Sequence, residues 1–500
     1  TDLHTHLSGA VHAEAMVRWG ARDGVCVDTF TLTSSYPPCA VGQVPLTQAL
    51  SDNQLYNRII GAWSMRGFTP GVESGHDHFF ATFDRFGAAF GARKGDGLAE
   101  VAQRAALQNE QYIEPLITPQ FGKVSTLAKA VGWDRDFAAL RTKLLDAGLR
   151  GILPAARSDL DATLAQERDA LHCGTSLAKR GCRLRVGFDV QVLRGMAPEV
   201  VFAQLLFGFE LQGDDPRWVG LNMVQPEDGP IALRDYRLQM RMIGFLRTLY
   251  PQAHVTLHAG ELAPGVVPPA DLRFHINDAV EVAGADRIGH GVDLRWEHDP
   301  QRILRSMKRR HTCVEINLTS NRQILGVSGR AHPLDTYVRA GVPVTLSTDD
   351  EGVERTDLTA QYVQAVQDHG LGYRRLKTIA RTGLVSHAGG WPSGVLKKAK
   401  SRSKSFSASS ASASGRAAIC SSVAGRSVQD RAAFSEIATN RSSARAPCAA
   451  SGACPTRGSR CATWPGTPAA PIGAASPTSI RPASASSWSI PATSSAIARS

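Results

Sequence analysis

Four short fragments place His, Asp or Glu side chains directly after short apolar runs that predict β-strands. They are residues 2–10 (DLHTHLSGA), 258–261 (HAGE), 287–291 (RIGHG) and 347–350 (STDD). Imidazoles and carboxylates are the groups that bind a catalytic metal ion and transfer protons. Because the carboxyl ends of parallel strands meet at one face of a barrel, we expect these side chains to form a single site there.

Apolar runs with β-strand character alternate with helical patterns along residues 1–385. We expect strands to end near Leu3, Leu116, Leu193, Val224, Leu257, Ile288, Ile316 and Leu346. We expect helices over Gly97–Asn109, Ile231–Leu249, Asp278–Ala283 and Thr359–His369. This alternation predicts an α/β fold of the (β/α)8 TIM-barrel type. A doubly wound sheet is the alternative, but His4-Thr5-His6 stands where that fold usually has a glycine-rich turn.

The barrel is predicted to span residues 1–385, with an insertion after the first strand over residues 11–90. From about residue 386 the composition changes to Ser, Ala, Arg and Pro, and residues 388–500 carry a net charge of +12 against −1 for the rest. We therefore expect residues 386–500 to form a disordered, low-complexity basic tail. GC-rich codons read out of frame would give the same composition, so a frameshift is one interpretation and a genuine anion-binding tail is the other.

Charge and hydropathy exclude some classes of function. The sequence pI of 9.4 comes from the tail, so it gives no reason to expect the barrel to bind nucleic acid. No apolar stretch reaches the roughly 18–20 residues of a membrane span. No signal peptide is visible, but the chain opens at Thr1 inside a predicted strand, which leaves room for upstream residues that were removed or never recorded.

His4 and His6 are two residues apart, so on a strand both side chains point to the same face and can share one ion. His258 and Asp349 each follow an apolar strand. Three imidazoles and one carboxylate, with room for a water molecule, suit one catalytic Zn²⁺ per chain. For each residue taken alone, the alternative of a packed or solvated side chain, or of a turn residue, remains open.

Glu261 lies three residues after His258, a spacing that lets it face a substrate and serve as a proton donor. A helix N-terminal Glu favoured by the helix dipole is the alternative. His290 is a candidate ligand or base, or a structural His, and Asp350 can contact substrate or cap a helix. The joint occurrence of these residues in this order favours a site over chance.

These motifs together resemble the adenosine deaminase family of metal-dependent hydrolases, whose fold is a (β/α)8 barrel with one zinc ion. The resemblance covers about residues 1–385 and rests on four fragments in order. It implies that the zinc ligands are His4, His6, His258 and Asp349. It also implies that Glu261 protonates the purine, that His290 orients or deprotonates the zinc-bound water, and that Asp350 hydrogen-bonds to the purine.

By the same resemblance, the activity is hydrolytic deamination of adenosine or 2′-deoxyadenosine to the inosine product and ammonia. His6, Ser8 and Asp350 would contact the substrate, although many such enzymes have an Asp that contacts ribose where this chain has Ser8. Residues 220–227 (GLNMVQPE) lack the family's purine-contacting glycine. The alternatives are deamination of another aminopurine, adenine or a modified adenosine, and a non-enzymatic growth-factor-like binding protein. A two-metal hydrolase of a cyclic amide or ester is less consistent, because no bridging Lys lies near Val224.

The cysteines are informative about the cellular compartment in which the protein works. Five lie in the predicted barrel and none forms a CxxC pair: Cys26, Cys39, Cys173, Cys182 and Cys313. The long insertion is similar to the extracellular, growth-factor-related branch of the family, which implies a disulfide between Cys26 and Cys39 and a periplasmic or secreted location. Free thiols in a cytosolic enzyme are the alternative. We expect a small purine nucleoside as partner, no nucleic acid and no transmembrane segment, and we leave the oligomeric state open.

Overall fold

The computed structural model describes residues 1–386 of the chain. Contacts between residues divide the chain into two units, Thr1–Gly390 and Trp391–Ser500. The predicted tail and its possible frameshift fall almost wholly outside the described residues, so both stay predictions. Within residues 1–386, every helix is too short or too polar to cross a membrane.

The described residues contain two main parallel sheets. The first has the order β1-β5-β7-β8, with β6 beside β5, and the second has the order β12-β11-β10-β9. The strands are β1 (Asp2–His6), β5 (Tyr112–Ile117), β6 (Arg185–Val186), β7 (Phe188–Leu193), β8 (Trp218–Val224), β9 (Thr256–Ala259), β10 (Arg287–His290), β11 (Cys313–Ile316) and β12 (Val344–Leu346). Every strand expected from the sequence is present, and each ends within three residues of its expected position.

The two sheets meet along both of their edges. Beyond β12, Asp349 pairs in parallel with Thr5 of β1, and the amide of Asp349 donates to the carbonyl of His4 at 2.9 Å. At the other edge, the amide of His258 on β9 donates to Oδ1 of Asn222 on β8 at 2.8 Å. Within the described residues no backbone ladder joins β8 to β9. The strands therefore follow one another in chain order around a common centre.

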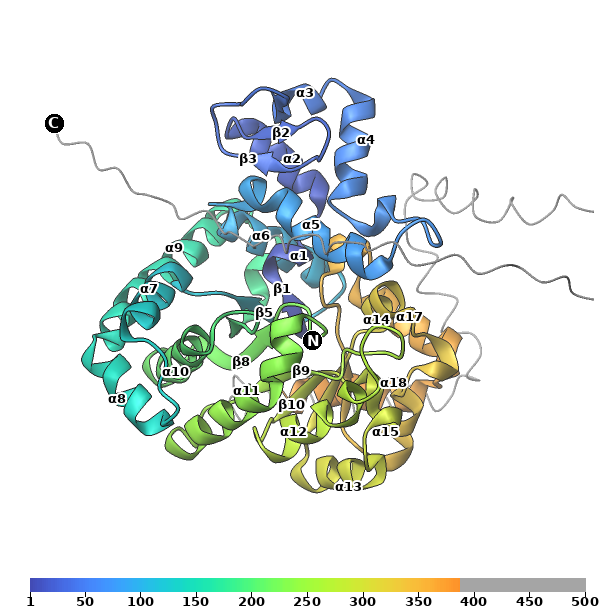
Figure 1. The fold of residues 1–500 in the computed structure, drawn as a ribbon. Helices are drawn as coiled ribbons and strands as arrows, with labels where there is room; N and C mark the ends of the chain where they lie inside the picture. The colour runs from blue at the N-terminus through green and yellow to red at the C-terminus, as the bar shows by residue number, and fades with distance from the viewer. Residues whose placement is uncertain (387–500) are drawn as a thin grey trace, which may run out of the picture. The chain divides into compact units, whose positions relative to one another are not determined.

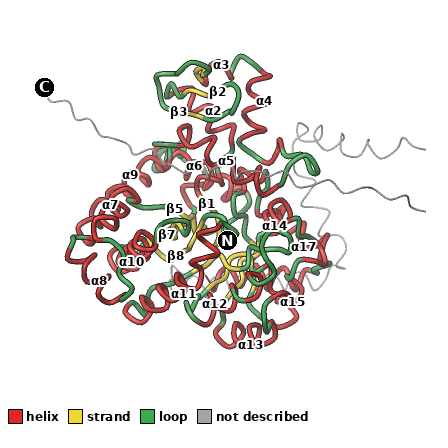
Figure 2. The backbone as a smooth tube through the Cα atoms, in the orientation of Figure 1, coloured by secondary structure: helices red, strands yellow, loops and turns green. Residues whose placement is uncertain are grey.

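Helices surround these strands in the view of Figure 1, and Figure 2 shows the strands in yellow at the centre. The α-helices that follow β5 in the chain are α7 (Phe121–Val131), α8 (Phe137–Asp146), α9 (Leu153–Ala170), α10 (Pro198–Asp214), α11 (Pro230–Leu249), α12 (His275–Glu281), α13 (Pro300–Arg310), α14 (Leu318–Leu325), α15 (Leu334–Ala340), α16 (Glu351–Glu354), α17 (Leu358–His369) and α18 (Tyr373–Ser386). The expected helices correspond to α6 (Lys94–Leu107), α11, α12 and α17. Because α18 packs on β12, the last strand is covered by a described helix.

Most of the strands are buried along their whole length, as helix-covered parallel strands are. Each residue of β8, β9, β10, β11 and β12 is buried. Leu257, Ile288 and Val314 belong to one continuous apolar core together with residues of the surrounding helices. This rigid interior fixes the positions of the strand ends that carry the polar fragments.

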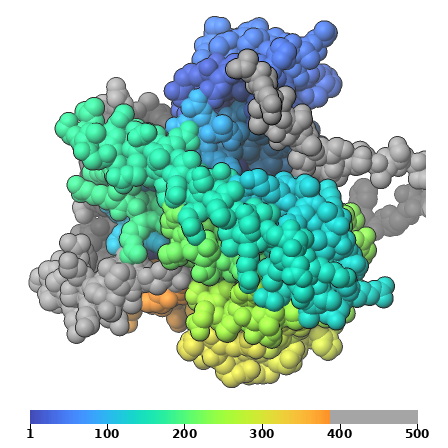
Figure 3. All heavy atoms as spheres, turned by 90° about the vertical axis from the view of Figure 1, so that its left-hand side faces the viewer, coloured from blue at the N-terminus to red at the C-terminus, as the bar shows by residue number. Residues whose placement is uncertain are grey.

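The segment after β1 forms a separate small sheet and several helices. They are α1 (Leu7–Ala10), α2 (Ala13–Arg22), β2 (Cys26–Asp28), β3 (Ser34–Ser35), β4 (Gln43–Pro45), α3 (Leu46–Ala49), α4 (Asn53–Ala62), α5 (Gly75–Phe90) and α6 (Lys94–Leu107). The order of the sheet is β3-β2-β4, and both pairings are antiparallel. Figure 3 shows much of this segment in blue, at the top of the view.

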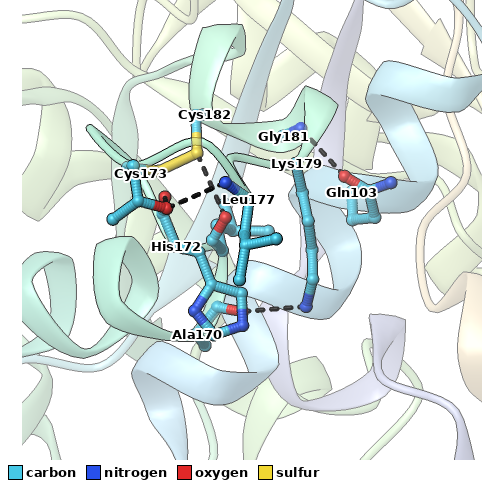
Figure 4. The surroundings of a disulfide bond; sticks show 10 residues. Gln103, Ala170, His172, Cys173, Leu177, Lys179, Gly181 and Cys182 are labelled. Carbon is cyan, nitrogen blue, oxygen red and sulfur yellow. Dashed lines mark hydrogen bonds between the residues drawn. A yellow bond between two sulfur atoms is a disulfide. The ribbon is translucent and has the colours of Figure 1, made fainter.

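Two disulfides lie within the described residues. Cys26 pairs with Cys39, which confirms the disulfide predicted in the insertion, and Cys173 pairs with Cys182, which the sequence did not predict. Figure 4 shows the second pair closing the loop after α9, where the amide of Gly181 donates to Oε1 of Gln103 on α6 at 3.0 Å. The remaining described cysteine is free and buried.

Candidate active site

Four side chains from β1, β9 and the segment after β12 converge at the carboxyl ends of the strands. Nε2 of His258 lies 3.1 Å from Nε2 of His4 and 3.2 Å from Nε2 of His6. Oδ1 of Asp349 lies 3.5 Å from Nε2 of His4 and 3.3 Å from Nε2 of His6. The structure therefore brings together the four residues that the sequence predicted as metal ligands.

The spacing of these four atoms fits a tetrahedral metal ion. With metal–ligand bonds of about 2.0–2.1 Å, neighbouring ligand atoms in a tetrahedral zinc site lie roughly 3.3–3.4 Å apart. The distances given above, 3.1–3.5 Å, lie around that value. Burial, followed by the charges of neighbouring histidines, holds the pKa of His258 well below its usual value. Its imidazole is therefore neutral, which is the form that binds a metal.

Two of the imidazoles are oriented by polar side chains behind them. Nδ1 of His4 lies 2.7 Å from Oε2 of Glu315, and Nδ1 of His258 lies 2.8 Å from Oδ1 of Asn222. Since both oxygens are acceptors, each Nδ1 carries the proton and each Nε2 lone pair is left for an ion. The donor set thus has the outer hydrogen bonds that metal-binding histidines usually have.

Sequence reasoning missed these orienting residues. Glu315 and Asn222 lie in the apolar strands β11 and β8 and are fully buried. Gln191, on β7, makes a longer contact of 3.4 Å from its Oε1 to Nδ1 of His6. The sequence did hold a signal for them, a single polar residue within an apolar strand. Because a buried polar group needs a partner, such a residue indicates a hydrogen bond inside the fold.

Glu315 also belongs to a buried cluster of charges around Arg287, on β10. Nε of Arg287 donates to Glu315, while its Nη2 donates to Glu114 and lies 3.3 Å from Oδ2 of Asp189. All four side chains are at most 2% exposed. Since buried charges are stable only when they are paired, this cluster fixes the position of the carboxylate that contacts His4.

Glu261 and His290 lie beside the ligand set. Oε1 of Glu261 lies 3.4 Å from Nδ1 of His290, and Nε2 of His290 lies 3.7 Å from Oδ2 of Asp349. Burial, followed by the charge of Asp349, raises the pKa of Glu261 well above its usual value. A carboxyl that stays protonated near neutral pH can act as a proton donor.

The backbone at the site is held in an uncommon conformation. His290 and Asp349 have φ of +69° and +60°, in the left-handed region that non-glycine residues rarely adopt. Such residues persist where surrounding contacts over-determine them, and they gather at active sites. The amides of Gly260 and Glu261 are also fixed, because both donate to the carboxylate of Glu227, at 2.9 and 3.0 Å.

Asp350 lies next to Asp349 and approaches the helix that follows β1. A Cβ atom added to Gly9 would lie 1.6 Å from Oδ1 of Asp350, so this approach requires glycine. Oδ1 has no hydrogen-bond partner within the described residues, and burial raises the pKa of Asp350 well above its usual value. Ser8 lies in α1 beside Gly9, and no hydrogen bond of its side chain to the site is present in residues 1–386.

The insertion reaches the rim of this site through α5. Nε2 of His76 lies 3.1 Å from Oδ1 of Asp228, the residue after Glu227. Burial by itself would lower the pKa of His76, but hydrogen bonds to Asp228 and Asp77 raise it. The contact therefore ties the insertion to the loop that holds the amide of Glu261.

Comparison with known proteins agrees with this geometry. The sequence profile of the family described as "Adenosine deaminase" matches residues 219–389, a segment that includes His258, Glu261, His290 and Asp349. This segment is similar to the adenosine deaminase family. Adenosine deaminase of Escherichia coli (strain SE11) is 33% identical over 132 residues, which cover 26% of this chain and 36% of that protein. The chain thus spans about a third of the length of the curated relatives it matches.

Solved structures extend the likeness of fold to most of the chain. An Arabidopsis N6-mAMP deaminase superposes with a TM-score of 0.53 at 18% identity, covering 81% of this chain and 97% of that one. An Arabidopsis ADAL complexed with GMP gives the same TM-score and identity over 81% of this chain and 96% of its own. At this identity the likeness concerns the fold and not the substrate.

Proposed function

We propose that this chain is a zinc-dependent hydrolase that deaminates adenosine or 2′-deoxyadenosine, giving the inosine product and ammonia. The observation that carries the proposal is the convergence of His4, His6, His258 and Asp349 within hydrogen-bonding distances, with Glu261 and His290 beside them. We further propose that the strands around this site, which follow one another in chain order, form a (β/α)8 barrel. The match of residues 219–389 to the adenosine deaminase profile supports both statements.

The donor set suits one zinc ion, which three imidazoles and one carboxylate would hold. When bound, Zn²⁺ lowers the pKa of a water molecule to about 7 and so supplies the nucleophile for the amino-bearing ring carbon. Glu315 and Asn222 keep the ligand nitrogens of His4 and His258 free for the ion. The zinc ligands and the residues behind them thus form one preorganised unit.

Glu261 provides the proton for the purine ring. Burial and the charge of Asp349 raise its pKa and so favour the protonated form, which donates to the ring nitrogen next to the carbon under attack. Protonation of this nitrogen weakens the aromatic stabilisation of the ring, so that the nucleophile can add to the neighbouring carbon. The two amide bonds from Gly260 and Glu261 to Glu227 hold the loop in place during the transfer.

Asp350 binds the imidazole edge of the purine in this proposal. Its Oδ1 is unpartnered, and burial raises its pKa, so its carboxyl can donate a hydrogen bond to a ring nitrogen. In the proposal, His6 at the end of β1 and Ser8 on α1 also contact the substrate. The ribose contact differs from that of many nucleoside deaminases, since Ser8 has a shorter side chain than the Asp that they have.

An exported location is part of the proposal. Among the described cysteines, four form two disulfides and the fifth is buried, a pattern typical of proteins from oxidising compartments. The periplasm or the exterior therefore fits this chain better than the cytosol.

The test is a spectrophotometric assay of the full, zinc-loaded chain with adenosine, 2′-deoxyadenosine, adenine and an N6-modified adenosine, coupled to ammonia detection. Conversion of the first two, abolished in Glu261→Gln, supports the proposal. Turnover of adenine or the modified nucleoside alone would move the assignment to another aminopurine. No turnover of any purine by protein that carries one zinc per chain would refute the enzyme and favour a growth-factor-like binding protein.

A further inference from the structure

A chain of hydrogen bonds leads from His290 away from the site to a second buried histidine. Nδ2 of Asn321, on α14, lies 2.9 Å from Nδ1 of His290. Oδ1 of the same Asn321 lies 3.0 Å from Nε2 of His332. Nδ1 of His332 in turn accepts a hydrogen bond from the backbone amide of Leu334, at 3.2 Å. Two side chains that the sequence did not single out thus connect His290 to a backbone amide at the start of α15.

The backbone amide of Leu334 fixes which group donates in each hydrogen bond of this series. An amide N–H can only donate, so Nδ1 of His332 is the acceptor. A neutral imidazole carries one proton, and in His332 that proton is therefore on Nε2 and is donated to Oδ1 of Asn321. The amide group of Asn321 is then oriented with its NH₂ toward His290. Nδ1 of His290 receives that hydrogen bond and has no proton of its own.

The surroundings keep these three side chains in this orientation and protonation. The three side chains are at most 2% exposed, so no water competes for their polar atoms. Burial, followed by the charges of His369 and His290, lowers the pKa of His332 to about 3. A neutral His332 cannot present protons at both ring nitrogens, and reversing Asn321 would set two donors against each other in the core.

We propose that Asn321 and His332 are positioning residues that hold His290 as the neutral tautomer protonated on Nε2. This inference rests on the proposed function, because it concerns how His290 serves that site. With its proton on Nε2, His290 presents an N–H and not a lone pair toward Oδ2 of Asp349, 3.7 Å away, and toward the side-chain amide of Asn317, whose Oδ1 has no other partner within the described residues. Nε2 then serves as a donor to its neighbours and does not accept a proton.

The substitution Asn321→Asp separates this role from simple packing. Aspartate has the shape of asparagine and still accepts the bond from His332, but it has no N–H to donate to His290. Nδ1 of His290 must then carry a proton to keep the contact. Asn57→Asp, a change of the same chemistry at an exposed position on α4, is the matched control.

Nitrogen NMR of the full chain labelled with ¹⁵N-histidine reads the tautomer without any turnover. The ring signals of His290 are assigned by their loss in His290→Asn, in the zinc-loaded protein. We expect an unprotonated Nδ1 in the wild type and in Asn57→Asp, and a protonated Nδ1 in Asn321→Asp. A protonated Nδ1 in the wild type, or an unchanged Nδ1 in Asn321→Asp, would overturn the proposal.

Variants of His332 give a second readout. Glutamine can place an N–H near the position of the imidazole Nε2, whereas phenylalanine keeps the ring but has no donor. We expect His332→Phe and Asn321→Asp to lower kcat by about 10- to 100-fold with little change in KM, and His332→Gln to retain most of the wild-type kcat. Equal losses in His332→Gln and His332→Phe would show a packing role and overturn the proposal. If the tautomer of His290 switches as expected but no purine is turned over, the positioning role of Asn321 and His332 stands and the proposed function fails.

Discussion

Oε2 of Glu315 lies 2.7 Å from Nδ1 of His4, and neither side chain is exposed to solvent. The second oxygen of Glu315 accepts a hydrogen bond from Nε of Arg287, so one carboxylate serves both a candidate ligand and a buried cation. Replacing this carboxylate with an amide would leave one of its two neighbours facing an NH₂ group. The pair therefore connects the metal site to the charges beneath it.

The first prediction is that Glu315→Gln lowers the affinity for zinc by about 10- to 100-fold, because the amide no longer orients His4 as a carboxylate does. Competition with a chelator, followed by metal analysis, measures the change. Glu281→Gln, at a partly exposed carboxylate near Arg310, is the control and should bind zinc like the wild type. Equal affinities in both variants would show that Glu315 does not tune the site.

The second prediction separates metal binding from proton donation. Glu261→Gln should keep its zinc and lose roughly 10²- to 10⁴-fold in turnover, because the amide cannot give up a proton. His258→Ala should lose zinc itself. Metal content and initial rates are measured on the same preparations, and equal metal with equal rates in the two variants would contradict both assignments.

Turnover should also depend on pH through Glu261. Burial and the charge of Asp349 raise its pKa, and the donor is active only while it is protonated. The rate should therefore fall on the alkaline side, as pH rises through the raised pKa. A rate that increases steadily to high pH would rule out Glu261 as the donor.

The candidate ligands could be read from the sequence because their signals are local. His4 and His6 share a face through the two-residue period of a strand, and His258 and Asp349 directly follow apolar runs. The strand ends and four helices were predictable from the same alternation. These patterns involve neighbours along the chain, and so a single sequence shows them.

The residues that orient the site could not be predicted, because their partners are distant in sequence. Glu315 meets His4 across 311 residues, and Arg287 meets Glu114 across 173 residues. Only the closing of the strands around one centre brings these pairs together. The pairing of Cys173 with Cys182 was missed for a different reason: spacing alone does not tell whether two thiols face each other.

The fourth prediction concerns that second disulfide. Replacing both Cys173 and Cys182 with Ser should lower the free energy of unfolding by about 2–3 kcal/mol, since the bond closes a short loop and restricts the unfolded chain. Denaturant unfolding with and without a reductant measures the difference. The reductant should act less on the double variant than on the wild type, and peptide mapping should recover both Cys173–Cys182 and Cys26–Cys39. Recovery of free thiols in protein exported by its host would refute the pairings.

The last prediction is a dependence of stability on pH that arises from Glu297. Its Oε1 accepts hydrogen bonds from the amides of Ile276 and Asn277 at the start of α12, at 2.6 and 3.1 Å, while Oε2 has no partner within the described residues. Burial raises the pKa of Glu297 from 4.5 to about 7, although the two amide bonds lower it. Because the folded pKa lies above the unfolded one, the protonated carboxyl stabilises the fold fully below about pH 4.5, and this contribution is lost as pH rises through about 7.

Glu297→Gln keeps an oxygen that caps α12 and removes the titration. Between pH 5 and pH 8 the wild type should lose about 2–3 kcal/mol more of its free energy of unfolding than this variant, since each pKa unit corresponds to about 1.36 kcal/mol and part of the shift lies outside this range. Urea unfolding at both pH values measures the loss, and Glu281→Gln, at the other end of α12, should follow the wild type. If the stability of Glu297→Gln fell with pH as steeply as that of the wild type, then the carboxyl of Glu297 would already be ionised at pH 5, and its burial would not control the acid–base behaviour of this part of the fold.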